Sequence, residues 1–183
     1  MDNAIKFLFF NIFFLCMACS SDLSPSPAAA AMNSSNSTTS SSSSESLESW
    51  RDTCAVIVND YRATENITPL VRNTVEESCT DNQAAQDLTA NSAHGHFGSC
   101  NEYAQNTAPN IDVASYRSEA SMIRNYLKMM WEEEKAKAEA GDTVYANIGH
   151  YLNLKNSTYS SIACGIAYNS DSTKSWININ LYY

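Results

Sequence analysis

The hydrophobic pattern changes its period at Gly141, and this change limits the chain to few folds. Before Gly141, apolar residues recur at helical spacing in two segments, about residues 46–63 and 118–140, and an alanine-rich segment at about 71–92 predicts a further helix. After it, runs rich in aromatic and β-branched residues predict three strands, at 150–154, 159–168 and 175–183. Helices followed by strands that a hairpin at 169–174 connects predict an α+β domain with an antiparallel sheet.

The first 45 residues differ in composition from the rest of the chain, and we place them outside the folded domain. Residues 1–18 carry an apolar stretch shorter than the roughly 20 residues of a membrane span, and we interpret them as an export signal. Residues 19–45 are a Ser-rich flexible linker with little to bury. Cys19 follows small residues as in a bacterial lipoprotein signal, although an ordinary secretory signal stays open. Residues 46–183 then form one domain of an exported protein, in the extracellular space or at the cell-envelope surface.

The net charge of −9 argues against a nucleic-acid partner. Phosphate backbones are bound by clustered Lys and Arg, and the sequence has no such cluster. The chain also has only five glycines and no glycine-rich phosphate loop. Contact with a membrane is expected only through a lipid anchor at Cys19.

Four cysteines fall in the predicted domain: Cys54, Cys79, Cys100 and Cys164. An even number of cysteines in an exported domain predicts disulfides, and all three pairings stay open. A zinc site made of these cysteines is disfavoured because no two of the four form a CxxC pair.

The histidines are few and unevenly placed. The chain has three, and two of them, His94 and His96, lie within eight positions of Glu102 in a predicted loop. Imidazole and carboxylate groups suit a metal site or an acid–base site. The sequence therefore predicts half of such a site here, with His150 in the other half.

The order of several short motifs resembles the CAP superfamily (cysteine-rich secretory proteins, antigen 5 and pathogenesis-related 1 proteins), in particular its short exported bacterial members. The resemblance covers residues 50–183 and rests on motifs that match in order and spacing: Asn59–Arg62, Pro69-Leu70, His94, Asn101–Ala104, Trp131 with Glu134, Gly149–Tyr151 and Ala163–Gly165. It implies a three-layer α-β-α sandwich with a central antiparallel sheet and a cleft.

The resemblance also implies a set of site residues. His94, Glu102, Glu134 and His150 would converge in the cleft, where some family members bind Zn²⁺ or Mg²⁺. The family pattern has one histidine at the first position, which favours His94 over His96. Helical periodicity alone leaves Glu133 open beside Glu134, and the family register favours Glu134.

The function implied is that of an exported binding module. Its cleft would bind a divalent metal and a lipid, glycan, protein or cell-surface ligand, by analogy with the family. The alternative is a metal-assisted hydrolase that uses the same cleft with a glutamate as general base. A purely structural surface domain is the third interpretation. Departures from the family pattern, such as Asn101 and Tyr103 in the loop motif, concern ligand chemistry and leave the four site residues in place.

Overall fold

The computed structural model describes residues 49–183. The predicted signal, the linker and the first three residues of the predicted domain lie outside the described residues. The helices are α1 (Ser49–Thr64), α2 (Glu77–Ala90), α3 (Glu119–Lys128), α4 (Glu134–Glu139) and α5 (Tyr145–Lys155). The strands are β1 (Val71–Arg72), β2 (Ala104–Asp112), β3 (Ser161–Tyr168) and β4 (Lys174–Tyr182).

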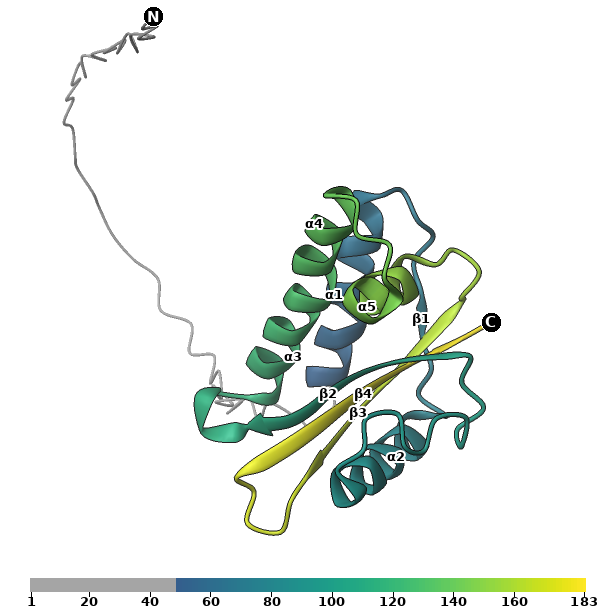
Figure 1. Cartoon of the computed structure of the whole chain (residues 1–183). Helices are drawn as coiled ribbons and strands as arrows, with labels where there is room; N and C mark the ends of the chain where they lie inside the picture. The colour runs from purple at the N-terminus through teal and green to yellow at the C-terminus, as the bar shows by residue number, and fades with distance from the viewer. Residues whose placement is uncertain (1–48) are drawn as a thin grey trace, which may run out of the picture. The chain divides into compact units, whose positions relative to one another are not determined.

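A single four-stranded sheet forms the middle layer, in the order β1-β3-β4-β2. Helix α2 covers one face, and α1, α3, α4 and α5 gather on the other (Figure 1). Strands β2, β3 and β4 pair antiparallel as predicted, and the two-residue β1 adds a parallel pairing, so the complete sheet is mixed. The structure confirms the predicted α+β three-layer architecture.

Strand β4 is buried on both faces, and the two faces differ in polarity. Ile177, Ile179 and Leu181 belong to the main apolar core. Asn178 and Asn180 alternate with them and are equally buried, and both donate hydrogen bonds to side chains of α2. The side of the sheet under α2 is therefore a polar interface, where buried amides need hydrogen-bond partners.

Helix α2 approaches this polar face unusually closely at Gly165 of β3. A Cβ atom built on Gly165 would lie 2.5 Å from the backbone of Thr80 in α2. Only glycine permits this approach, and it brings the polar side chains of α2 within reach of the sheet.

The Asn59–Arg62 motif fixes α1 to the segments that follow it. The side chain of Asn59 accepts from the backbone N–H of Leu70 at 2.7 Å and donates to its carbonyl at 2.9 Å. Arg62 is fully buried and donates to the carbonyls of Leu154 at 2.6 Å and Asn156 at 3.0 Å. These carbonyls lie at the C-terminus of α5, where a positive charge is favourable. Arg62 therefore positions α5.

Two disulfides connect the layers. Cys54 of α1 pairs with Cys164 of β3, and Cys79 of α2 pairs with Cys100 in the loop before β2. The structure thus confirms the predicted disulfides and selects one of the three pairings.

The strand predicted at residues 150–154 is wrong, because this segment lies in α5. Ile148, Tyr151 and Leu154 are buried at intervals of three residues, which is a helical spacing. A five-residue window is too short to distinguish that pattern from an alternating one. His150 therefore comes from a helix and not from a strand.

Strand β2 was not predicted, because its composition is polar. Its residues Gln105, Asn106 and Thr107 are buried and satisfied by hydrogen bonds, so no apolar alternation marks the strand. Pro109 and a register shift between Ala108 and Ile111 also interrupt it, which an edge strand tolerates.

The third predicted helix is one continuous element with an internal irregularity. Ser118 forms a capping box with Ser121 at its start, and Gly141, with φ +97°, follows its end. Between α3 and α4, Met129–Glu133 form a π-helical turn, a feature often found at functional sites. No helix among residues 49–183 is long and apolar enough to cross a bilayer.

Replacement of Arg62 by Met should destabilise the protein by about 3 kcal/mol or more, because the carbonyls that accept from the buried guanidinium lose charged hydrogen bonds. Urea unfolding followed by circular dichroism measures this loss. The control is Arg124→Met on the exposed side of α3, which should change the free energy of unfolding by less than about 0.5 kcal/mol. Equal stability of the two variants would contradict the assigned role.

Candidate functional site

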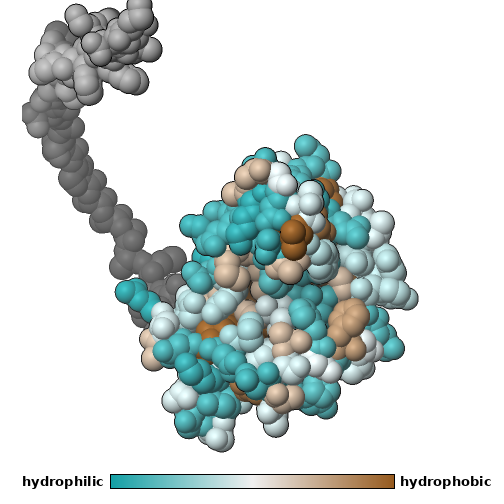
Figure 2. Space-filling view, viewed as in Figure 1, coloured by the Kyte–Doolittle hydropathy of each residue, from teal (hydrophilic) through white to brown (hydrophobic). Residues whose placement is uncertain are grey.

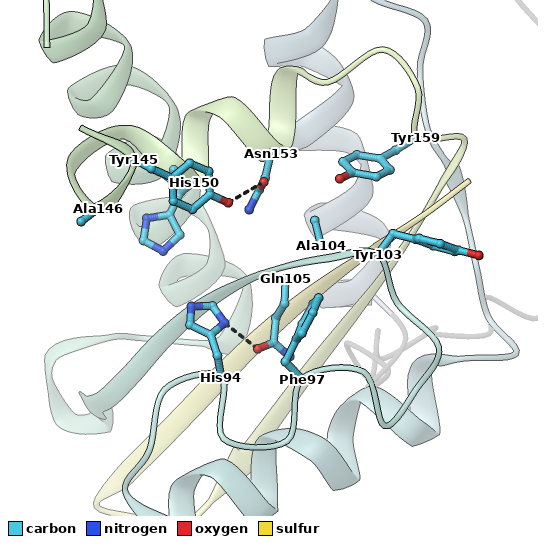
Figure 3. A pocket seen from close by; sticks show the side chains of 11 residues that line it. His94, Phe97, Tyr103, Ala104, Gln105, Tyr145, Ala146, His150, Asn153 and Tyr159 are labelled. Atoms are coloured by element: carbon cyan, nitrogen blue, oxygen red, sulfur yellow. Dashed lines mark hydrogen bonds between the residues drawn. The ribbon is translucent and has the colours of Figure 1, made fainter. Parts of the chain in front are cut away.

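A surface pocket of about 520 Å³ lies between α5 and the loop that follows α2. Its walls include His94 and Phe97 from the loop, Gln105 from β2, and His150 and Asn153 from α5. Figure 3 shows the rings of His94 and His150 on facing sides of this pocket. Two histidines that are 56 positions apart in sequence numbering thus line one cavity.

The ring of His150 is oriented by a hydrogen bond with Glu134. Its Nδ1 lies 2.5 Å from Glu134 Oε1, and Glu134 Oε2 accepts from the backbone N–H of Tyr151 at 3.1 Å. Glu134 is buried, whereas Glu132 and Glu133 are exposed, so the helix presents only one of the three glutamates to His150. With Nδ1 bound to a carboxylate, His150 keeps Nε2 for other partners.

His94 is held in a similar way by a neutral amide. Its Nδ1 lies 2.8 Å from Gln105 Oε1. The backbone of His94 is in the left-handed region with φ +60°, a conformation that is uncommon outside glycine and that is often found at functional sites. In both histidines Nδ1 is the hydrogen-bonded ring nitrogen, so Nε2 of His94, like Nε2 of His150, is left for another partner.

Glu102 shapes the loop that carries His94. Its Oε1 accepts from the N–H of Gly98 at 2.6 Å and from the side-chain amide of Gln83, and its Oε2 accepts from the N–H of Cys100 at 3.0 Å. Glu102 is buried and is not among the residues that line the pocket. Its carboxylate therefore satisfies backbone donors of a tight loop that the Cys79–Cys100 disulfide also ties to α2.

His96 lies outside the pocket. Its Nδ1 and its backbone N–H both contact Asp87 Oδ1, at 2.8 and 2.9 Å, and Asp87 is fully buried. His96 therefore attaches the loop to α2, while the neighbouring His94 faces the pocket.

The structure brings together some of the four predicted residues more closely than others. His94 and His150 line one pocket, Glu134 contacts His150, and Glu102 is directed into the loop. Within residues 49–183, no group of three or more His, Cys, Asp or Glu side chains is arranged to hold a metal ion. Sequence reasoning missed Gln83, Gln105 and Asn180, and the polar alternation of β4 was the available signal for the last of them.

Aromatic side chains surround the pocket mouth. Phe97, Tyr103 and Tyr145 are 49%, 59% and 60% exposed, and Tyr159 completes the lining. Burial raises the pKa of Tyr159, with the neighbouring Tyr183 adding to the effect, so its hydroxyl stays protonated at neutral pH. On the face seen in Figure 2 the surface is mainly hydrophilic, with apolar residues in small separate spots.

The family model of the cysteine-rich secretory protein family (CAP) matches residues 57–183. The chain therefore belongs to the CAP family. A search of curated protein sequences gives no match.

Solved structures show the same fold at low sequence identity. The crystal structure of NaASP2 with Zn²⁺ matches with a TM-score of 0.57 and 13% identity over 72% of this chain and 77% of that one. Na-ASP-1 matches with a TM-score of 0.54 and 15% identity, over 71% of this chain and 38% of its own. BmVAL-1 matches with a TM-score of 0.51 and 16% identity, over 71% and 74%. At these identities the likeness establishes the fold alone.

Replacement of Glu102 by Ala should loosen the loop, because the N–H groups of Gly98 and Cys100 lose a charged acceptor. We expect a loss of about 3 kcal/mol in stability and much faster hydrogen exchange at these two amides. Exchange followed by NMR measures the effect residue by residue. Glu133→Ala, at an exposed position, is the control and should leave both amides protected. Unchanged exchange in Glu102→Ala would contradict the assigned role.

Proposed function

We propose that the protein is an exported CAP-domain binding module that holds a divalent metal ion between His94 and His150. The observation that carries this proposal is the hydrogen bonding of the two imidazole rings. Each has Nδ1 engaged by a buried partner, Gln105 or Glu134, while both rings line the same pocket. Metal-binding histidines typically have this arrangement, in which one ring nitrogen is hydrogen-bonded and the other binds the ion.

The donors fit zinc better than magnesium. Neutral imidazole nitrogen is an ordinary zinc ligand, whereas Mg²⁺ prefers oxygen atoms in octahedral geometry. The crystal structure of NaASP2, which shares this fold, is a structure with Zn²⁺. Two protein ligands leave the remaining positions of the ion to water or to oxygen atoms of a bound molecule. The ion would supply Lewis acidity and positive charge to a pocket whose lining includes no Lys or Arg.

A binding function agrees better with the geometry than metal-assisted hydrolysis does. A general base needs a carboxylate that can reach a proton in the cleft. Glu102 already accepts from three donors and Glu134 from two, and neither lines the pocket.

The pocket lining favours a neutral glycan as the organic ligand over a lipid or a protein. The lining residues, all within the described part of the chain, include no Asp, Glu, Lys or Arg. Aromatic faces and neutral polar groups together match a sugar ring, which has apolar faces and hydroxyl edges. An acyl chain would require an enclosed apolar cavity, whereas three of the aromatic rings here are about half exposed or more.

Export and anchoring complete the proposal. Two disulfides agree with an oxidising compartment outside the cytosol. We propose secretion directed by residues 1–18, with attachment to a membrane only through a lipid on Cys19.

The purified protein should bind one zinc ion, and His94→Ala and His150→Ala should each abolish stoichiometric binding. Glu134→Ala should weaken affinity about 10–100-fold, because it leaves His150 without its orienting carboxylate. Calorimetric titration and elemental analysis measure both effects.

The matched control is His96→Ala, which removes the histidine of the same loop that lies outside the pocket. It should leave zinc affinity unchanged. Zinc binding that survives in the folded His94→Ala/His150→Ala double variant would refute the proposed metal site.

A neutral oligosaccharide such as chitotetraose should shift the NMR signals of Gly149 and Ala104 at the pocket wall. Phe97→Ala and Tyr145→Ala should reduce its affinity several-fold, because aromatic stacking area is lost from the rim. Tyr168→Ala removes a partly exposed tyrosine outside this pocket and is the control. Phosphatidylcholine vesicles are the lipid arm: binding of vesicles but not of the oligosaccharide, lost in the same two variants, would overturn the glycan assignment.

A further inference from the structure

A continuous network of buried polar side chains lies beneath the pocket and ends at His94. Its members are Glu102, Gln83, Asn180 and Gln105, which come from the loop, α2, β4 and β2 and are each exposed by 5% or less. A buried network of this kind permits only one assignment of donors and acceptors. The donors and acceptors follow in order from Glu102 to His94.

The network starts at Glu102, whose carboxylate only accepts. Gln83 Nε2 donates to Glu102 Oε1 and also to the carbonyl of His96 at 2.8 Å. Because both partners are acceptors, the NH₂ group of Gln83 must face them, and its oxygen must face the opposite way.

The orientation of Gln83 then determines that of Gln105. Gln83 Oε1 accepts from Gln105 Nε2 and from Asn180 Nδ2, both at 2.7 Å. Gln105 Nε2 also donates to Asn180 Oδ1 at 3.1 Å. The NH₂ group of Gln105 is thus turned into the protein, and its oxygen is turned towards His94.

The ring of His94 is the last member of the network. Gln105 Oε1 can only accept, so His94 Nδ1, at 2.8 Å, must carry the proton. A neutral imidazole has one N–H, and Nε2 is therefore left with a lone pair. This is the tautomer that a metal ligand on Nε2 needs.

We infer that Glu102 is a positioning residue that, together with the carbonyl of His96, orients Gln83 and so selects the tautomer of His94 through Gln105. The family resemblance implies Glu102 as a member of the metal-binding set, whereas its two oxygens are taken up by the loop and by Gln83. The two histidines would thus be oriented by different means, His150 by direct contact with a carboxylate and His94 by a carboxylate acting through two amides. The role of this orientation in metal binding rests on the proposed function, whereas the tautomer of His94 follows from the hydrogen bonds alone.

The test uses long-range ¹H–¹⁵N NMR of the metal-free protein at mildly alkaline pH. We expect His94 in the Nδ1–H form. Gln105→Leu removes the acceptor, and His94 should change to the Nε2–H form that an unpartnered imidazole favours in water. His96 and His150 are internal controls, because Asp87 and Glu134 hold them independently.

A second variant reaches one step further along the network. Gln83→Met should leave Gln105 oriented by Asn180 alone, so His94 should show a mixture of the two tautomers. Zinc affinity should fall about 10–100-fold in Gln105→Leu and by less in Gln83→Met. If Gln105→Leu does not fold, the wild-type spectrum and Gln83→Met still decide the question.

The outcomes separate this inference from the proposed metal site. An Nε2–H form of His94 in the wild type, or an unchanged tautomer in the folded variants, would overturn the inference even if zinc binds. The expected tautomers in a protein that binds no zinc would support the network and refute the metal site.

Discussion

The buried polar face of the central sheet is the constraint on which the rest of the structure depends. Strand β4 alternates isoleucine with asparagine, so one face joins the apolar core and the other carries amides that must find partners inside the protein. Helix α2 supplies them because Gly165 lets its backbone approach the sheet. Thr80, Gln83 and Asp87 are buried there and bind Asn178 and Asn180. The pocket lies where this polar interface reaches the surface.

The two sides of the pocket are held in place by different interactions. Helix α5, which carries His150, is held at its C-terminus by the guanidinium of Arg62. The loop that carries His94 is held by Glu102, by the Cys79–Cys100 disulfide and by the contact of His96 with Asp87. The family motifs that contain Asn59, Arg62 and Glu102 therefore act mainly by positioning the segments that carry His94 and His150.

An apolar period predicted an element correctly where the burial of that element follows the same period. The stripe of the third helix and the alternation of β4 met this condition, and the structure confirms both. Strand β2 and helix α5 did not, because β2 buries polar side chains and α5 was judged from a window of five residues. The site residues also differed in how far the sequence marks them. The histidines could be predicted from their rarity and their motifs, whereas Gln83 and Gln105 gain their meaning only from contacts between distant segments.

Neither site glutamate lines the pocket, because Glu134 contacts His150 directly and Glu102 reaches His94 only through Gln83 and Gln105. A carboxylate that bound the ion directly would add a negative charge to the cleft, whereas Glu134 and Glu102 direct their charge to imidazole, amide and backbone donors. Two neutral nitrogen ligands bind an ion less strongly than a set that includes carboxylates, and they leave more positions open to oxygen atoms of a guest. The aromatic rim surrounds the mouth of the same pocket, so in the proposed function a bound metal and a hydroxyl-bearing ligand would be neighbours.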